Sequence, residues 1–321
     1  MCAIYGFLNY GRKVKNKVLK NILRELSIAA ECRGTDATGI SYVNNGEIVT
    51  FKQPKPAHKM KLFFPKDTVA VIGHNRLTTQ GSEKKNCNNH PFEGKTPQHS
   101  FALAHNGVLY NDKEIKREKK LPQTQIETDS YVAAQLIEQT ENVDMDSVKD
   151  MAEIVDGSFV FTILRDDNTL FLVKGSNPIT LYHFPEQELY IYASTKEILK
   201  TALKNARFKE PYEEIKIDTG DILQINADGE IFCDTFETIS QYHFDWHDWY
   251  GLYSCEESED DLLAICNCFG VDREDVMLLL DFGYTADDIE EMLMDSDLLE
   301  ETLADIKEMN HQYEELWEYC V

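Results

Sequence analysis

Short apolar runs, alternating or continuous, dominate the first 235 residues of the chain. Turn-forming residues separate many of these runs, as expected of β-strands. The predicted strands read GISYV, IVTFK, VAVIGH, SFALAHNG, GSFVFTIL, TLFLVKG, ELYIYAS and GDILQIN. Strands far outnumber the helices that could connect parallel neighbours, so the pattern favours antiparallel sheets with helices packed outside them.

Two stretches show apolar residues at helical spacing instead. The first runs from Asn16 to Glu31 and the second from Asp129 to Gln139. In both stretches the apolar positions fall on one face, which indicates helices that cover a sheet. The first 235 residues are therefore predicted to form an α+β domain.

The pattern changes after about Phe236. An aromatic segment, QYHFDWHDWYGLY, leads into short runs with helical spacing, each preceded by a residue that commonly caps helices. The predicted helix starts are Ser258, Asp272, Thr285 and Asp297. We predict a main domain at 2–236, a linker at 237–257 and a small acidic all-α domain at 258–321.

Charge divides the chain at the same place. Of the 57 acidic residues, 25 lie at positions 236–321, where Arg273 and Lys307 are the only basic residues, so the local net charge is −23. The remaining 32 acidic and 30 basic residues give positions 1–235 a net charge of −2. This distribution lacks the basic surface that phosphates need, so we expect no nucleic acid and no membrane as partners.

Further composition signals limit the class of protein. No apolar run is long enough to span a membrane and basic residues follow the start closely, so we expect a soluble, cytoplasmic protein without a signal peptide. The eight cysteines form no CxxC pair, which predicts reduced thiols. Neither the pair Cys266 and Cys268 nor the pair His243 and His247 has further ligands at metal spacing. We therefore expect no metal and no cofactor.

Cys2 stands directly behind the initiator methionine and in front of a predicted buried strand. If Met1 is removed, Cys2 carries both a thiol and a free α-amine, which can serve as a nucleophile and its general base. A small apolar residue at the start of a strand would look the same. Cys2 alone therefore leaves both interpretations open.

Two segments could bind or position a substrate beside Cys2. In RGTDATG, at 33–39, Arg33 and Asp36 can pair and fix a turn. In GHNRLTTQG, at 73–81, Arg76 offers a fork of N–H donors for a carboxylate. Each segment is also compatible with a purely structural role.

Two later segments could supply the remaining polar groups. In AHNGVL, the side-chain amide of Asn106 and the backbone N–H of Gly107 form a pair of adjacent donors suited to an oxyanion. In IETDSYV, Asp129 either caps the following helix or provides the counter-charge for a substrate ammonium. Singly, neither segment decides between structure and function.

In this order, the segments resemble one family, the class II glutamine amidotransferases, which are N-terminal nucleophile hydrolases. The shared pieces are MCAIYG, RGTDATG, HNRLTTQG, NNHP, HNG and ETD, followed by DGSFVFTIL, YIYASTKEIL and IDTGDILQINADGEI. The resemblance covers roughly residues 2–236. It implies a four-layer αββα fold, with two antiparallel sheets between helices. In this chain the small acidic all-α domain comes after that fold.

The resemblance also implies a role for each candidate residue. Cys2 matches the nucleophile, with its α-amine as the base, and Asn106 and Gly107 match the oxyanion hole. The remaining matches are Arg76 for the glutamine α-carboxylate, Asp129 for its α-amine, Leu77, Thr79 and Gln80 on the pocket loop, and Arg33, Gly34 and His105 in support. Three positions depart from the family: Ala3 replaces a glycine, and Leu77 and Gln80 stand where some members have Trp and His.

The implied reaction converts glutamine to glutamate and ammonia through a γ-glutamyl thioester. The 85 residues after Phe236 lack a pyrophosphate loop, so no ammonia acceptor site is expected within the chain. Three interpretations stay open: a glutaminase that supplies a separate synthase subunit, a stand-alone hydrolase of γ-glutamyl amides, and a non-catalytic interaction protein. The acidic domain is expected to bind a protein partner. The complete set of candidate residues disfavours the third interpretation.

Overall fold

The computed structural model describes residues 2–237 and, further along the chain, residues 266, 271–282, 284, 286–293, 299, 302–304, 306 and 307. The chain divides into two compact units, Met1–His243 and Phe244–Val321. The predicted linker lies outside the described residues beyond Glu237, as do the predicted helix starts at Ser258, Thr285 and Asp297. The predicted domain boundaries therefore stay predictions.

The first unit contains a seven-stranded antiparallel sheet with the first strand of the chain near its centre. Its order is β11 (Glu213–Ile215), β9 (Thr180–Phe184), β10 (Leu189–Ala193), β1 (Ala3–Leu8), β4 (Ala70–Arg76), β2 (Ala37–Asn44) and β3 (Glu47–Gln53). Every residue of β1 is buried, because β10 and β4 pair with its two edges and other layers cover both faces. The sequence AIYGFL suits this place, since it has no charged side chain.

A second sheet, also antiparallel, has six strands. Its order is β13 (Ile231–Thr235), β12 (Asp221–Ile225), β8 (Leu170–Lys174), β7 (Gly157–Arg165), β6 (Ser100–Leu109) and β5 (Phe92–Lys95). Strand β5 is short and pairs only with Ser100–Leu103 of β6. The rest of β6 pairs with β7 alone among the described residues, so no strand pairs with its other edge there.

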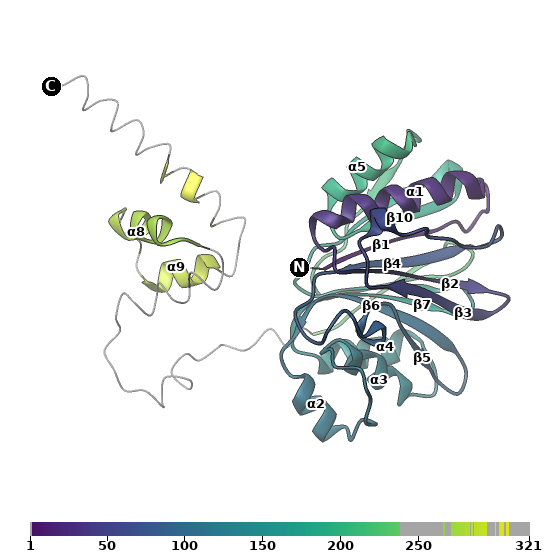
Figure 1. Cartoon of the computed structure of the whole chain (residues 1–321), viewed down its shortest axis with the longest axis horizontal. Coiled ribbons are helices and arrows are strands. Elements are labelled where there is room, and N and C mark those ends of the chain that lie inside the picture. The colour runs from purple at the N-terminus through teal and green to yellow at the C-terminus, as the bar shows by residue number, and fades with distance from the viewer. Residues whose placement is uncertain are drawn as a thin grey trace. The chain divides into compact units, whose positions relative to one another are not determined.

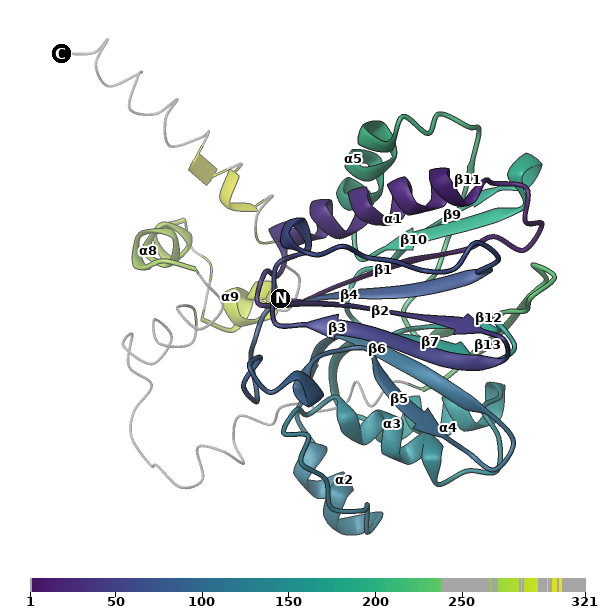
Figure 2. The ribbon, with the colours of Figure 1, turned by 45° about the vertical axis from the view of Figure 1, so that its right-hand side comes forward.

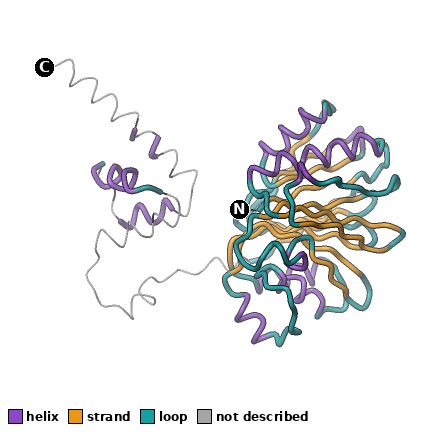
Figure 3. The backbone as a smooth tube through the Cα atoms, viewed as in Figure 1, coloured by secondary structure: helices purple, strands orange, loops and turns teal. Residues whose placement is uncertain are grey.

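Helices cover the outer face of each sheet, so the unit has four layers (Figures 1, 2 and 3). Helices α1 (Asn16–Ala29) and α5 (Lys196–Ala206) lie on the first sheet, while α3 (Tyr131–Glu138) and α4 (Met145–Ile154) lie on the second. The short helix α2 (Asp112–Glu118) follows β6. This arrangement confirms the predicted αββα sandwich.

Apolar side chains fill the three spaces between these layers. Because successive side chains of a strand point to opposite faces, each central strand contributes to two of the spaces. In β1, Tyr5 and Phe7 pack under the first helix layer, whereas Ile4 and Leu8 enter the space between the sheets. In β6, Leu103 packs toward the second helix layer and Ala104 enters the space between the sheets.

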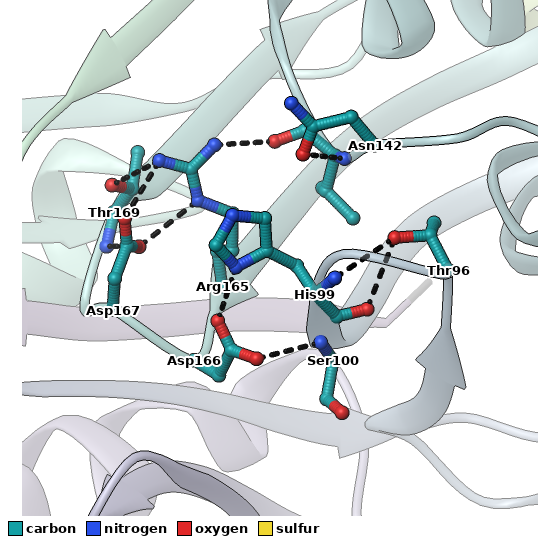
Figure 4. Close-up of polar contacts among 9 residues, drawn as sticks. Thr96, His99, Ser100, Asn142, Arg165, Asp166, Asp167 and Thr169 are labelled. Atoms are coloured by element: carbon teal, nitrogen blue, oxygen red, sulfur yellow. Dashed lines mark hydrogen bonds and ion pairs between the residues drawn. The ribbon is translucent and has the colours of Figure 1, made fainter.

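A polar network fixes the turns at the far end of β6 and β7, at the opposite end of β6 from Gly107 (Figure 4). The Asp166 carboxylate accepts a hydrogen bond from Ser100 N at 2.7 Å and pairs with His99 Nδ1 at 2.6 Å. Arg165 donates to both carboxylate oxygens of Asp167 and to the carbonyl of Val143 before α4. These bonds tie the β5–β6 and β7–β8 turns together and so help to hold the strand register.

The second unit contains two described helices, α8 (Arg273–Asp281) and α9 (Ala286–Leu293). The carboxylate of Asp272 accepts a hydrogen bond from the backbone N–H of Asp275, which confirms the predicted helix start at Asp272. Cys266 and Ile289 belong to a small apolar cluster in this unit. Cys268, His243 and His247 lie outside the described residues.

The helices of the first unit differ from the prediction in their boundaries and in their number. The first predicted helix ends as an α-helix at Ala29 and continues as a 3₁₀ turn over Ala30–Cys32. The second begins at Tyr131 rather than at Asp129. Helices α2, α4 and α5 were not predicted, although the sequence signals α4 and α5 by the capping residues Asp144 and Thr195, which both accept hydrogen bonds from the first turn.

The described residues show the state of the thiols, the metal-ligating side chains and the helix lengths. Their five cysteines are free thiols, and no group of three or more His, Cys, Asp or Glu side chains among them is placed to hold a metal ion. No helix in this part of the chain combines the length and the apolar composition that crossing a membrane requires.

The network of Figure 4 predicts a local acid sensitivity. Burial alone would raise the pKa of Asp167, but hydrogen bonds from Arg165 and Thr169 outweigh it and lower the pKa from 3.8 to about 2. A carboxyl with a lowered pKa stabilises the fold above its unfolded pKa, and this stabilisation disappears as the pH falls from about 4 to about 2. We expect Asp167→Asn to lower the free energy of unfolding at pH 7, because the amide cannot replace the charged partner of Arg165. The loss should be only about 1 kcal/mol, because the side chain is partly exposed and water screens the interaction.

Urea unfolding at several pH values measures this difference. The gap between Asp167→Asn and the unsubstituted protein should close between pH 4 and pH 2. Asp218→Asn serves as a control, because Asp218 pairs with Lys216 on the surface at 63% exposure. A gap that stays constant down to pH 2 would contradict the assignment.

Candidate active site

Strand alternation brings the polar ends of three strands into the space between the sheets. Cys2 precedes Ile4 by two positions, and Arg76 follows Ala70 and Ile72 on β4 with the same alternation. Asn106 follows Ala102 and Ala104 on β6. Since Ile4, Ile72 and Ala104 all face the space between the sheets, Cys2, Arg76 and Asn106 are directed into the same layer.

The RGTDATG segment holds the backbone around Cys2 and Arg76. Arg33 Nε donates to the carbonyl oxygen of Cys2 at 2.8 Å, and Asp36 accepts a hydrogen bond from Thr78 N at 2.8 Å. The backbone N–H of Asp36 also donates to the carbonyl of Arg76. Gly34 passes so close to Arg76 that a Cβ atom would lie 2.5 Å from its carbonyl carbon. Glycine is therefore needed for this close approach.

Arg76 is buried, and its guanidinium is held by the loop that follows it. Nη1 donates to Asn89 Oδ1 at 2.8 Å, and Nη2 donates to the carbonyl oxygens of Gln80 and Gly81 at 2.5 and 3.0 Å. Burial lowers the pKa of Arg76, whereas the Cys2 thiol and Glu83 raise it. An arginine stays protonated at neutral pH even so. The site therefore contains a buried cation whose hydrogen-bond partners here are neutral oxygens.

The Asn106–Gly107 segment presents polar groups that protein atoms do not satisfy. The Asn106 side chain is fully buried, yet neither its Nδ2 nor its Oδ1 has a hydrogen-bond partner. A buried amide of this kind costs roughly 1–3 kcal/mol unless another molecule satisfies it. Gly107 has a φ of 145°, and a Cβ atom there would lie 1.8 Å from the carbonyl oxygen of Ser158. Only glycine fits this position.

Asp129 and His105 come from neighbouring segments of the second sheet and its helix layer. Asp129 Oδ2 accepts a hydrogen bond from Leu109 N at 2.7 Å. Because this carboxylate bonds across to β6, the helix-cap interpretation of Asp129 is wrong; the residue before α3 is Ser130, whose side chain makes no cap. His105 Nδ1 lies 2.7 Å from Ser130 Oγ, and its ring stacks on Phe161.

Three buried histidines surround the inner end of the site. The rings of His74 and His90 lie 4.2 Å apart, and His74 Nε2 donates to the carbonyl of His105. Burial is the main cause that lowers the pKa of His74 to about 3 and that of His105 to about 4, and it lowers the pKa of His90 in the same direction. All three rings are therefore neutral at pH 7.

One small cavity connects most of these residues. Its lining combines Cys2, Arg76, Leu77, Thr79, Gln80, His90, His105, Gly107, Thr128, Asp129 and Ser130. The cavity has room for about one water molecule in this conformation. A larger ligand therefore requires part of the cavity lining to move; Leu77 in that lining is 41% exposed.

The structure brings together the residues proposed from the sequence. Eight of them line the cavity, whereas Arg33, Gly34 and Asn106 are not among its lining residues. His90, Thr128 and Ser130 also line it, and they were not predicted to do so. The NNHP and ETD segments contain or adjoin these three residues, so the motifs carried the signal although the individual side chains were not singled out.

Burial determines the state of the Cys2 thiol. The side chain is 9% exposed, and Sγ donates a long hydrogen bond of 3.5 Å to the carbonyl of Leu77. Burial is the largest effect and raises the pKa of Cys2, although the Leu77 hydrogen bond and the Arg76 charge act in the opposite direction. The resting thiol is therefore protonated at neutral pH and needs a base before it can act as a nucleophile.

A second, larger groove of about 820 Å³ lies away from Cys2. It runs along α1, and its lining includes four basic residues, Lys17, Lys20, Arg24 and Lys61. None of the residues proposed from the sequence as site residues lines this groove. Its size does not make it the site, because the chemistry is concentrated in the small cavity.

Comparisons with known proteins agree with this geometry. Residues 74–201 match the family model described as the glutamine amidotransferase domain. The glutamine–fructose-6-phosphate aminotransferase (isomerizing) of Staphylococcus aureus is 30% identical over 190 residues, which cover 56% of this chain and 30% of that protein. The protein of the same name from Aquifex aeolicus is 29% identical over 255 residues, covering 76% of this chain and 38% of the relative.

A solved structure matches the fold. The glutamine phosphoribosylpyrophosphate amidotransferase from B. subtilis aligns with a TM-score of 0.57 at 20% identity, over 74% of this chain and 49% of that chain. This chain thus spans less than two-fifths of the length of those two curated relatives and about half of this solved structure.

Two antiparallel sheets between helix layers, with a cysteine at the start of a central strand, define the fold of an N-terminal nucleophile hydrolase. Within that fold, residues 74–201 match a glutamine amidotransferase domain, homologous to part of the two aminotransferases. The family resemblance and the fold class inferred from the sequence are confirmed.

The close approach of Gly34 to Arg76 generates a prediction about Cys2. We expect Gly34→Ala to push the Arg76–Leu77 peptide aside, to cost about 1–3 kcal/mol of stability, and to expose the thiol that Leu77 now shields. Alkylation by iodoacetamide, followed by mass spectrometry, should show Cys2 reacting faster than in the unsubstituted protein.

Gly46→Ala is the matched control. Gly46 has a φ of 78°, and no atom lies within 4 Å of the position that a methyl group would take, so its substitution costs stability through backbone strain alone. Alkylation of Cys2 should be unchanged in this variant. Equal Cys2 reactivity in both variants would show that Gly34 does not shape the pocket.

Proposed function

We propose that the protein is a glutaminase, in which Cys2 hydrolyses the side-chain amide of glutamine to give glutamate and ammonia. The family of the domain supports the reaction class. The observation that carries the proposal is the buried side-chain amide of Asn106, which has no hydrogen-bond partner in the protein. Its neighbours in the chain, His105 and Gly107, both line the cavity that contains Cys2. An oxyanion formed on the substrate would supply the missing acceptor.

The charged residues of the cavity fit the two ends of an amino acid. Arg76 provides a planar fork for the α-carboxylate, and Asp129 provides a counter-charge for the α-ammonium. A substrate carboxylate would replace the carbonyl oxygens of Gln80 and Gly81 as partners of Arg76. We infer that glutamine binding opens the 77–81 loop, on which Thr79 contributes a further donor.

The proposed reaction begins when the free α-amine of Cys2 takes the thiol proton. The thiolate then attacks the δ-carbon of glutamine, and the negative charge moves to the carbonyl oxygen, where Asn106 Nδ2 and Gly107 N–H donate to it. The C–N bond breaks, the ammonium group of Cys2 returns the proton to the departing nitrogen, and ammonia leaves. Water adds to the γ-glutamyl thioester, the C–S bond breaks, and glutamate and the thiol are released.

We further propose that the ammonia serves a separate synthase. Support comes from the domain family, because the similar proteins are named as aminotransferases that use glutamine. The acidic second unit is the proposed docking element for a protein partner, because its net charge separates it from the nearly neutral body. A stand-alone γ-glutamyl amide hydrolase remains the alternative, since Arg76 and Asp129 would recognise only the γ-glutamyl part of a substrate.

The role of Cys2 predicts both a processing event and a labelling pattern. Intact-mass measurement of active protein should show that Met1 has been removed, because a peptide bond at Cys2 would abolish the base. A glutamine analogue with an electrophile at the δ-position should then add once, at Cys2. Cys2→Ala should lose both labelling and ammonia release.

The exposed cysteines provide an internal control for this experiment. Cys32, Cys87 and Cys233 are more accessible than Cys2 and would react first with an unselective reagent. Labelling at any of them in place of Cys2, or full activity in protein that retains Met1, would contradict the proposed mechanism.

Arg76 predicts a specific defect in substrate binding. Arg76→Lys keeps the positive charge but loses the planar fork, so we expect the KM for glutamine to rise about tenfold or more while kcat changes less. Steady-state ammonia release measures both constants. Arg165→Lys is the control: it removes an equivalent fork from the network of Figure 4 and should lower stability without changing KM.

A further inference from the structure

A residue outside the family motifs contacts the proposed oxyanion hole from behind. Asn177 lies in the loop between β8 and β9, and its Nδ2 donates to the carbonyl oxygen of Asn106 at 2.9 Å. The two residues are 71 positions apart in the sequence. We propose that Asn177 is a positioning residue that sets the direction of the Gly107 N–H; this inference rests on the proposed function.

Peptide geometry connects the two groups. The carbonyl of Asn106 and the N–H of Gly107 belong to one planar trans unit, in which they point in opposite directions. A hydrogen bond that fixes the carbonyl therefore also fixes the N–H. No described strand holds this peptide on the β5 side of β6, because β5 pairs only as far as Leu103. On its other side β6 pairs with β7, and Asn177 approaches from there, because Gly175 of the same loop bonds to Phe159 of β7. The hydrogen bond from Asn177 adds a side-chain constraint on the Asn106 carbonyl to the strand pairing.

Close packing shows that Asn177 and the peptide fit together tightly. A Cβ atom on Gly107 would come within 2.7 Å of Asn177 Nδ2 and within 1.8 Å of the Ser158 carbonyl oxygen. The amide of Asn177 therefore occupies space that any side chain at Gly107 would need. Glycine at 107 and asparagine at 177 form a matched pair.

The loop that carries Asn177 is held on both sides. Gly175 N donates to the carbonyl oxygen of Phe159 at 3.0 Å, and Phe159 is the register partner of Gly107 on β7. On the other side, Ile179 is buried in the apolar layer between the sheets. Asn177 is thus half-buried on a loop anchored directly against the end of β6 and β7.

The loss of this hydrogen bond should affect turnover rather than binding. The oxyanion develops only in the transition state, whereas Arg76 and Asp129 contact the amino-acid end of the substrate in the ground state. We expect Asn177→Ala to lower kcat about 10- to 100-fold, less than the roughly 10²–10³-fold typical when an oxyanion donor itself is removed. The KM for glutamine and the inhibition constant of glutamate should stay within about twofold.

Two further variants separate the hydrogen bond from the shape of the side chain. Asn177→Asp has the same size but no donor, and its charge repels the Asn106 carbonyl, so its kcat should fall at least as far as that of Asn177→Ala. Asn177→Gln retains the donor on a longer arm and should recover part of the lost turnover. Ser176→Ala, an exposed neighbour on the same loop, is the matched control and should leave both constants unchanged.

The experiment uses the full chain with Met1 removed, and melting temperatures are measured for every variant. Wild-type protein that releases no ammonia from glutamine would overturn the proposed function itself. Active wild type with an unchanged kcat in Asn177→Ala and Asn177→Asp would overturn only the role of Asn177. A parallel rise in KM with a large drop in melting temperature would also overturn it, because such a result indicates a structural residue.

Discussion

Packing of one β-sheet against the other constrains every other feature of the site. Side chains alternate along each strand, so the residues that face the opposite sheet on β1, β4 and β6 share one dry layer. Over most of their length these residues are apolar, as Ile4, Ile72 and Ala104 illustrate. At one end the same alternation directs Cys2, Arg76 and Asn106 into that layer. Polar groups there have little access to water and depend on protein partners or on a ligand.

Local signals in the sequence predicted antiparallel sheets with helices outside them, and the ordered motifs, through their resemblance to a family, predicted the four layers and most of the candidate site. Strand runs, turn residues and the motifs around Arg76 and Asn106 are all read from neighbouring positions. The contacts that escaped prediction are long-range. Asp129 resembles a helix cap in the sequence, yet it bonds to Leu109 on another strand, and Asn177 reaches a peptide 71 positions away. The capping signals of α4 and α5 are local and could have been used.

Arg76 explains why the cavity is closed in this state. A buried guanidinium must have acceptors, and among the described residues these are Asn89 and the carbonyl oxygens of Gln80 and Gly81. These bonds fold the loop over the cavity and leave room for about one water molecule. A carboxylate is a stronger partner than two carbonyl groups, because the hydrogen bonds then join opposite charges. Arg76 therefore closes the cavity in this conformation, and an anionic ligand would compete with the loop for its N–H groups.

The burial that assembles the site also keeps the Cys2 thiol protonated at rest. Cys2 lies under the Leu77 carbonyl, and burial raises the pKa of its thiol, while the three histidines nearby are neutral for the same reason. A histidine base would need a pKa near neutrality, and burial has moved the pKa of His74 to about 3 and that of His105 to about 4. In the proposed mechanism the base is the α-amine of Cys2 itself, which lies beside the sulfur by covalent geometry. On that proposal, the neutral histidines of the dry layer agree with a base that belongs to Cys2 rather than to another side chain.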